Sequence, residues 1–202
     1  MAGIFRIKTG ILLSGGIDSA CVAYWKRPTI AFNINYGQRP AVAERAASHE
    51  IAKSIGIPLV NIDIDCSSLG SGDLTDEKAL SIAPTPEWWP YRNQLLVTLA
   101  CMKAVQSGVK KLLVGTVSTD KKQKDGRKQF YEILNSLVKF QEGGIQIITP
   151  AIHLTATELA TKSKIPDSVL GWTHSCHVSN FPCGKCNGCL KHLTTKKMIF
   201  NL

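Results

Sequence analysis

The chain has no hydrophobic run long enough to cross a membrane, no internal repeat and no low-complexity tract. Residues 1–8 are too few and too mixed in character for a signal peptide. Apolar residues make up 44% of the 202 positions and charged residues 19%, a composition that excludes a disordered chain. We therefore expect a cytoplasmic globular protein with one sizeable core, or one core and a small appended module.

Acidic residues are scarce compared with basic ones. The 15 Asp and Glu residues against 24 Lys and Arg give a net charge of +9. This balance suits polyanionic partners, and ATP, pyrophosphate and RNA all qualify. The lysines are scattered, with denser groups at 121–128 and 191–197, and such groups are most often solvated faces. The charge alone does not choose among these partners.

A Walker A loop is also absent, because the glycine-rich stretch of this chain has no lysine. Residues 11–20 read I-L-L-S-G-G-I-D-S-A, an apolar strand followed by a loop and by a helix that begins at about Ala20. Two glycines allow a tight turn with inward N–H groups, and a helix N-terminus adds positive potential, so the stretch predicts an anion site. The alternative is an ordinary strand-to-helix turn. The residues expected to hold the phosphates of ATP, with Asp18 also helping to hold magnesium, are Ser14, Gly15, Gly16, Ile17, Asp18 and Ser19.

Predicted strands and helices alternate along the chain. Apolar residues at 3.6-residue spacing predict the helices, and short alternating or continuous apolar runs predict the strands. Strands that alternate with helices indicate a doubly wound parallel α/β sheet with right-handed crossovers. The expected strands are 5–13, 29–36, 59–64, 111–114 and 145–148, and the expected later helices are 41–55, 90–108, 130–138 and one that starts with the Thr155–Glu158 capping box and ends at Pro166.

Ligands of such sheets bind outside the C-terminal ends of the strands, near the reversal in strand order. Four segments fall at those ends: 14–19, 36–39, 115–120 and 150–155. A further segment, 66–89, shows no period, and a long irregular stretch inside a compact domain is usually disordered or functional. We expect the functional residues to converge at this edge of the sheet.

Four of the seven cysteines crowd into fourteen positions with the spacing C-x6-C-x2-C-x2-C. In a chain without a secretory signal, this clustering favours metal binding over disulfides. Four thiolates with no open position are typical of structural zinc, while an iron–sulfur cluster could use the same ligands in a chain with other redox features. We expect a nucleotide-binding domain at 1–172 and a zinc module at 173–202, with the ligands Cys176, Cys183, Cys186 and Cys189.

Six motifs occur in one order along the chain. They are the S-G-G-x-D-S loop, Tyr36-Gly37-Gln38-Arg39, Pro90-Tyr91-Arg92-Asn93, Gly115 to Asp120, Asp125-x-Arg127-x-x-Phe130 and the four cysteines. In this order they resemble the 7-cyano-7-deazaguanine synthase family of PP-loop ATP pyrophosphatases, and the resemblance covers nearly the whole chain. It implies a fold of the adenine nucleotide alpha hydrolase type, often as a homodimer, that uses ATP, magnesium and zinc. The implied activity is that of a carbon–nitrogen ligase of the queuosine pathway. Such an enzyme adenylates the carboxylate of 7-carboxy-7-deazaguanine, releases pyrophosphate and AMP, and with ammonia makes an amide and then a nitrile.

The chemistry suggests a role for each candidate residue. A carboxylate accepts no amine until it is adenylated, and donors must meet the pyrophosphate where its charge appears. A carboxylate matches the N–H edge of a deazaguanine, and an arginine matches its carboxylate. We therefore expect Asp120 and Asp125 at the substrate edge or at magnesium, and Arg92 and Arg127 at anionic groups, with surface ion pairs as the alternative. Phe130 either stacks on the substrate or packs in the core. The expected catalytic residues are Ser14, Asp18, Ser19, Arg92 and Asp120, with Tyr36, Gln38 and Arg39 added to the nucleotide site and Asn93 to the substrate site.

The chain departs from the family pattern at three positions. Ala156 stands where the family has a lysine, and Pro40 and Ala43 stand where it has histidine and glutamate. These losses raise an alternative: an antiphage-defence relative that stops at the amide and joins the deazaguanine carboxylate to an amine on a protein partner. Its polar losses would make room for a polypeptide.

A tRNA-thiolating PP-loop enzyme and a non-enzymatic binding module fit the sequence less well. Thiolation would need a cysteine pair beside the nucleotide, and Cys21, Cys66 and Cys101 are isolated in sequence, so nucleic acid is not the expected partner. A zinc module on an inert scaffold would turn over no ATP and would bind RNA with a strong dependence on salt.

Overall fold

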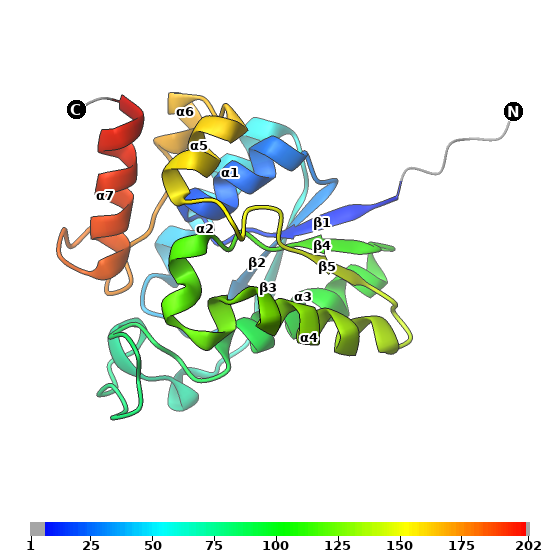
Figure 1. Cartoon of the computed structure of the whole chain (residues 1–202), viewed down its shortest axis with the longest axis horizontal. Helices are drawn as coiled ribbons and strands as arrows, with labels where there is room; N and C mark the ends of the chain where they lie inside the picture. The colour runs from blue at the N-terminus through cyan, green and yellow to red at the C-terminus, as the bar shows by residue number, and fades with distance from the viewer. Residues whose placement is uncertain (1–6, 201–202) are drawn as a thin grey trace, which may run out of the picture.

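The computed structural model describes residues 7–200, and it confirms an α/β protein built on a five-stranded parallel sheet (Figure 1). The strand order is β3-β2-β1-β4-β5, and all four neighbouring pairs are parallel. The strands are β1 (Thr9–Leu12), β2 (Ile30–Asn35), β3 (Leu59–Asp63), β4 (Lys111–Leu113) and β5 (Gln146–Ile148). All five expected strands are present, and residues 5 and 6 of the first one lie outside the described range.

The helices connect the strands as doubly wound crossovers. They are α1 (Ile17–Lys26), α2 (Ala41–Ile55), α3 (Arg92–Gln106), α4 (Lys128–Phe140), α5 (Ala156–Ser163), α6 (Asp167–Leu170) and α7 (Asn187–Phe200). The Thr155–Glu158 capping box is confirmed, because the Thr155 hydroxyl accepts from the Glu158 amide and the Glu158 carboxylate accepts from the Thr155 amide.

Two helix boundaries differ from the prediction. Helix α1 begins at Ile17 and not at Ala20, because Gly16 caps it and the Ser19 hydroxyl donates to the Gly16 carbonyl within the first turn. Helix α5 ends at Ser163 and not at Pro166, since Lys164 adopts a left-handed conformation that stops it. Pro166 instead caps the short, unexpected α6.

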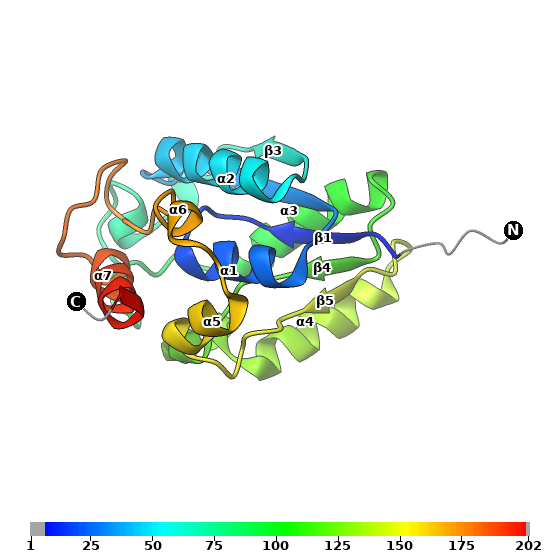
Figure 2. The ribbon, with the colours of Figure 1, turned by 90° about the horizontal axis from the view of Figure 1, so that it is seen from above.

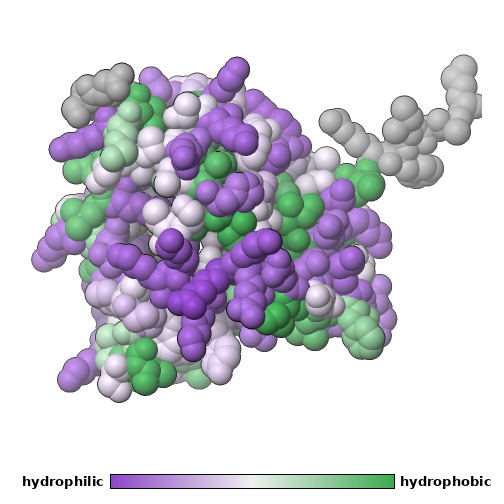
Figure 3. All heavy atoms as spheres, viewed as in Figure 1, coloured by the Kyte–Doolittle hydropathy of each residue, from purple (hydrophilic) through white to green (hydrophobic). Residues whose placement is uncertain are grey.

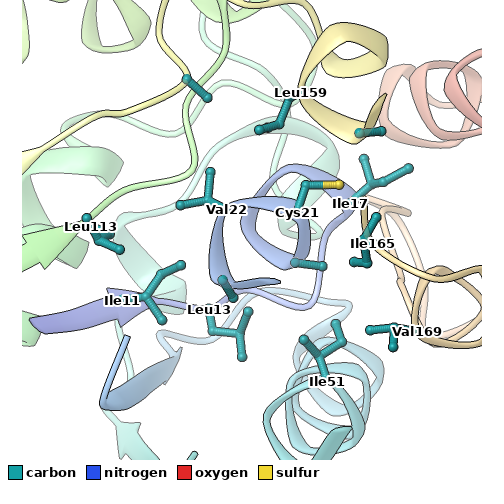
Figure 4. Packing of buried hydrophobic residues seen from close by; sticks show 14 of the residues in the cluster. Ile11, Leu13, Ile17, Cys21, Val22, Ile51, Leu113, Leu159, Ile165 and Val169 are labelled. Carbon is teal, nitrogen blue, oxygen red and sulfur yellow. The ribbon is translucent and has the colours of Figure 1, made fainter. Parts of the chain in front are cut away.

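Helices cover both faces of the sheet (Figure 2). One buried cluster lies on the first face of the sheet (Figure 4). It contains Ile11 of β1, Leu13 just after β1 and Leu113 of β4, together with residues of helices α1, α2, α5 and α6. Helices α3 and α4 share the other cluster with Phe32 and Leu112. Leu112 and Leu113 are neighbours that pack into opposite clusters, as the two-residue repeat of a strand requires.

The strand order reverses at β1, which has β2 on one side and β4 on the other. The loops that follow β1 and β4 therefore meet at the C-terminal edge of the sheet. A Cβ atom built on Gly115 would lie 2.8 Å from Cα of Ser19, so only glycine allows the second loop to approach the first this closely. This contact places residues 14–19 and 115–120 in one site.

The irregular segment after β3 packs on the rest of the molecule. It contains the short 3₁₀ helices Ser67–Leu69 and Gly72–Leu74, and its Leu74 and Trp89 are buried. The Trp89 ring meets Tyr36 edge to face, with centroids 4.9 Å apart. The segment thus covers the end of β2 and leads directly into α3.

The C-terminal helix α7 packs against α5, at the left of Figure 1. The stretch that precedes α7 runs along the loop after β1, where the amide of His174 donates to the carbonyl of Gly15 at 2.9 Å. In residues 7–200, no helix combines the length and the apolar character that a membrane crossing requires.

Candidate active site and metal centre

The Ser14–Ser19 loop forms a nest of donors at the start of α1. Gly15 has a positive φ of 81°, and Gly16 caps the helix. The hydroxyls of Ser14 and Ser19 lie 3.2 Å apart, and the Gly16 amide donates to the Ser14 hydroxyl at 3.3 Å. The first-turn amides of α1 have no partner within their own helix, so they are available to an anion beside the exposed Ser14.

Buried hydrogen bonds fix the position of this loop. The Asn33 side-chain amide donates to the Leu13 carbonyl and to the Ser48 hydroxyl, both at 3.0 Å, and the Ser48 hydroxyl donates to the same carbonyl at 2.8 Å. Asn33 and Ser48 are both buried. Buried polar groups with satisfied partners hold their geometry strongly. The end of β1 therefore presents the loop as a rigid cradle.

An ion-pair cluster closes one side of the cradle. The Lys191 ammonium of α7 lies 2.8 Å from Asp18 Oδ2 and 2.9 Å from Asp120 Oδ1. Burial opposes the charge of Lys191, but these two carboxylates outweigh burial and raise its pKa to about 12. The sequence had placed Lys191 in a basic surface group beside the cysteines, and the structure corrects this: its ammonium enters the phosphate site. Only its position two residues after Cys189 pointed to a fixed location.

Asp120 and Asp125 lie in the loop that follows β4. Asp120 Oδ2 accepts from the Val117 amide at 3.0 Å and from the Thr116 hydroxyl at 3.3 Å. The Asn93 side-chain amide donates to the Asp125 carbonyl at 3.2 Å, which ties the start of α3 to this loop. The structure thus brings Asn93, Asp120 and Asp125 to one edge of the sheet.

Arg92 is the first residue of α3, and Tyr36 and several carboxylates lie near its side chain. Burial opposes its charge, but Tyr36 and the carboxylates of Asp125, Glu44 and Glu87 together raise its pKa further. An arginine held charged in a partly buried position can meet a second anion at little reorganisation cost. This placement fits a residue that binds an anionic group better than it fits a surface ion pair.

The Tyr36–Arg39 turn shows a different arrangement. The side-chain carbonyl oxygen of Gln38 accepts from the Tyr36 amide at 2.8 Å, while its side-chain amide donates to the Ile34 carbonyl and to Glu44 Oε2, at 3.2 and 2.7 Å. Arg39 Nη1 lies 3.4 Å from Oδ1 of the exposed Asp76. Gln38 therefore braces the turn internally, and direct contact of Tyr36, Gln38 and Arg39 with a nucleotide stays a prediction.

Glu44 is a site residue that sequence reasoning missed, since only its position in a helical period was visible. Burial raises its pKa from 4.5 to about 7, although the hydrogen bond from Gln38 and the charge of Arg92 oppose the change. An acid with a raised native pKa stabilises the fold fully below its unfolded pKa, and this stabilisation is lost as the pH rises through the native pKa.

We expect the Glu44→Gln variant to remove this pH dependence. The difference in free energy of unfolding, variant minus wild type, should increase by about 3 kcal/mol between pH 4.5 and pH 8. This is the free-energy equivalent of the pKa shift of Glu44. Urea unfolding across that range measures the difference. Glu132→Gln, at an exposed carboxylate of α4, should give a curve parallel to wild type. Parallel curves for Glu44→Gln as well would show that Glu44 has the same pKa in the native and the unfolded state, and would refute the raised native pKa.

Arg127 and Phe130 lie at the other side of the same loop. Arg127 is exposed, and its Nε donates to the Lys121 carbonyl at 3.0 Å. Phe130 is partly buried against the second core cluster and meets Tyr131 edge to face at 5.1 Å. The core-packing interpretation of Phe130 thus has structural support, while a stacking role stays a prediction. Figure 3 shows hydrophilic side chains over the start of α4, where this loop lies.

The four C-terminal cysteines form one cluster. Their Sγ atoms all lie within 4.8 Å of one another, with Cys183 to Cys189 at 3.9 Å and Cys176 to Cys186 at 4.0 Å. These separations are far longer than a disulfide bond and close to the edge of a tetrahedron of thiolates around one ion. Amides of Lys185 and Cys186 donate to Cys183 and lower the pKa of its thiol to about 6. The cluster is thus prepared for a metal, as the spacing predicted.

The donor sets fit the expected ions. The four convergent sulfurs suit zinc. Asp18 Oδ1, at the start of α1, and Asp125 Oδ1, in the loop after β4, are buried carboxylate oxygens without a hydrogen-bond partner among the described residues. Unpartnered carboxylate oxygens next to a phosphate cradle are the hard ligands that magnesium prefers.

Comparison with known proteins agrees with this geometry. The family model described as "Queuosine biosynthesis protein QueC" matches residues 8–198. The chain belongs to the QueC family. It is similar to the 7-cyano-7-deazaguanine synthase of Chlorobium phaeovibrioides, with 31% identity over 96% of this chain and 93% of the relative. It is also similar to the 7-cyano-7-deazaguanine synthase of Campylobacter concisus, with 27% identity over 90% of each chain. The QueC match supports an enzyme with a PP-loop fold.

The three positions expected from the sequence to differ from the family pattern are Pro40, Ala43 and Ala156. Pro40 caps the start of α2, and the Ala43 amide donates to the Asn180 side chain at 3.0 Å. Ala156 is buried at the first position of α5, the helix on which α7 packs. Ala43 and the helix that Ala156 begins therefore contact the C-terminal module.

Proposed function

We propose that this QueC-family protein is an ATP-dependent carbon–nitrogen ligase that adenylates the carboxylate of 7-carboxy-7-deazaguanine. An amine then displaces AMP, and with ammonia the product is the amide. A second ATP would adenylate the amide oxygen, which would leave with AMP to give 7-cyano-7-deazaguanine. One observation carries the proposal: the Ser14–Ser19 donors lie at the strand-order reversal, beside Asp18, Asp120 and Lys191. We further propose a cytoplasmic homodimer with this small molecule as its substrate.

The geometry of the loop supports the activation step. The substrate carboxylate attacks the α-phosphorus of ATP, the bond from that phosphorus to the bridging oxygen breaks, and pyrophosphate leaves. Its developing charge would meet the first-turn amides of Ile17 and Asp18, with the hydroxyls of Ser14 and Ser19 beside them. Magnesium, which Asp18 would help to hold, would neutralise phosphate charge.

The substrate would lie between α3 and the loop after β4. Arg92 is the candidate for its carboxylate, and Arg127 for a second anionic group. Asp120 and Asp125 are the candidates for the N–H edge of the base, with Asn93 holding Asp125 in place. Because Asp120 is already shared with Lys191, Asp125, which has a free carboxylate oxygen among the described residues, is the better placed of the two for the base.

Zinc in the four-cysteine centre would have a structural role. The four cysteines supply four ligands and leave no open position, so the metal would bind no substrate. We propose the same division as the sequence predicted, a nucleotide-binding domain at 1–172 and a zinc module at 173–202. The module contacts the phosphate loop through His174 and Lys191.

The natural amine is tested by the products. Purified protein is incubated with 7-carboxy-7-deazaguanine, ATP and ammonia, and the small molecules are identified by mass spectrometry. We expect the nitrile to form together with AMP and pyrophosphate. AMP with amide but no nitrile, and a mass increase on an added protein, would support the defence-type acceptor. The absence of substrate-dependent AMP would refute the ligase proposal altogether.

Thiolation of tRNA has no support among the described residues. Cys21 lies on α1 near the phosphate loop, but its side chain is buried in the core and burial raises its pKa to about 12. Cys66 and Cys101 belong to the cluster on the opposite face of the sheet. A nucleophilic thiol needs exposure and a lowered pKa, but Cys21 and Cys66 are buried, and burial raises the pKa of Cys101 to about 11.

A further inference from the structure

The phosphate loop lacks a cation of its own. Residues 14–19 contain no lysine and no arginine, although a departing pyrophosphate gathers negative charge there. The basic group that reaches this loop is Lys191, which is 173 residues away from Asp18 in sequence. A lysine brought from a different part of the chain to a site that needs positive charge calls for a functional explanation.

The contacts of Lys191 leave one donor unused. An ammonium has three N–H donors, and two of them point to Asp18 Oδ2 at 2.8 Å and Asp120 Oδ1 at 2.9 Å. The side chain keeps 33% of its surface exposed, so the third donor has access to a ligand. The two carboxylates hold the ammonium in place without exhausting its capacity to bind.

Contacts hold both the first turn of α7 and the stretch that precedes this helix. Cys189 lies two residues before Lys191, and the Leu190 amide donates to the Cys186 carbonyl at 3.0 Å, so the cysteine cluster sets the first turn of the helix. On the other side, the His174 amide donates to the Gly15 carbonyl at 2.9 Å. The module is thus docked on the loop that its lysine enters.

We propose that Lys191 is a catalytic residue that binds the transferring and leaving phosphates of ATP, and that the four-cysteine centre serves to place it. This inference rests on the proposed function. When the bond between the α-phosphorus and the leaving oxygen breaks, pyrophosphate takes the electron pair, and Lys191 stabilises its charge without giving up a proton. Asp18 and Asp120 are positioning residues for the ammonium, in addition to any contact with magnesium or substrate.

The test compares Lys191→Met, which removes the charge, with Lys191→Arg, which keeps it. Substrate-dependent AMP and pyrophosphate release gives kcat and KM for ATP, while melting temperature and zinc content report the fold. We expect Lys191→Met to lower kcat by about 100-fold or more, as removal of a transition-state donor does. Lys191→Arg should recover at least about a tenth of wild-type kcat, since the charge remains. Lys197→Met, at an exposed lysine of the same helix, should match wild type.

Two results would overturn the proposal. One is a kcat for Lys191→Met close to that of wild type. The other is equal loss in the Met and Arg variants with equal loss of zinc, which would show a structural role. If the unpaired carboxylates unfold Lys191→Met, the double variant K191M/D120N removes one of them. It should fold, bind zinc and have a lower kcat than Asp120→Asn alone, and an equal kcat would refute the role of Lys191.

Failure of the ligase proposal gives a different result. Wild type would then release no AMP with 7-carboxy-7-deazaguanine, and ATP binding by calorimetry replaces kinetics as the measurement. Weaker ATP binding by Lys191→Met than by Lys197→Met would keep Lys191 as a phosphate ligand, and equal binding would refute it.

Discussion

Replacement of Cys186 by serine is expected to abolish both zinc binding and substrate-dependent AMP release. The buried cluster of the module consists of the cysteines with Val178 beside them, so little apolar packing would remain to hold residues 176–186. Metal binding in such small modules is folding free energy, on the order of 10 kcal/mol in isolated zinc peptides. Loss of the metal would release the base of α7, and Lys191 with it, so we expect activity to fall by more than about 100-fold.

A matched control is available in Cys101→Ser. Cys101 lies half-buried on α3, in the cluster on the far face of the sheet, and is not part of the metal centre. Metal content by mass spectrometry, melting temperature and AMP release should all stay close to wild type. A strong chelator should reproduce the Cys186→Ser result in wild type and leave Cys101→Ser no more sensitive than wild type. Full activity in metal-free protein would refute the structural role.

The sequence predicted the elements of the fold well because the patterns are local. The five strands, the capping box at Thr155 and the four-cysteine cluster each follow from periodicity or spacing within a few residues. The loop of residues 14–19 likewise lies between a strand and a helix as predicted, while its binding of phosphate stays a prediction. The same reasoning missed α6, whose four residues are too few for a period, and it mistook Pro166 for the end of a helix when it caps the next one.

The site was less predictable because its partners are distant in sequence. Lys191 meets Asp18 and Asp120 across 173 and 71 residues, and no local pattern distinguishes such a lysine from a solvated one. Glu44 shows the same difficulty, because the Gln38 and Arg92 side chains that act on its carboxyl group lie outside its own helix. Long-range electrostatics of this kind requires coordinates.

Replacement of Gly15 by alanine should damage the phosphate cradle more than any other single methyl group. Gly15 has a φ of 81°, and a Cβ there would lie 2.6 Å from the Glu44 carbonyl oxygen and 2.8 Å from the Ala47 Cβ. The left-handed conformation costs about 1–2 kcal/mol for alanine, and overpacking against the α2 backbone adds about 1–3 kcal/mol. We expect a loss of about 2–5 kcal/mol in the free energy of unfolding, the sum of these two costs. Most ATP binding should be lost as well, and urea unfolding and calorimetry measure the two effects.

Gly16→Ala separates backbone strain from the mere addition of a methyl group. Gly16 has a φ of −72° that alanine adopts freely, and the nearest atom to its added Cβ is the Ser14 hydroxyl at 3.4 Å. Its free energy of unfolding should therefore stay within about 1 kcal/mol of wild type. If Gly15→Ala were equally stable, α2 would have to move away from the loop. The rigid cradle on which pyrophosphate capture depends would then not exist in solution.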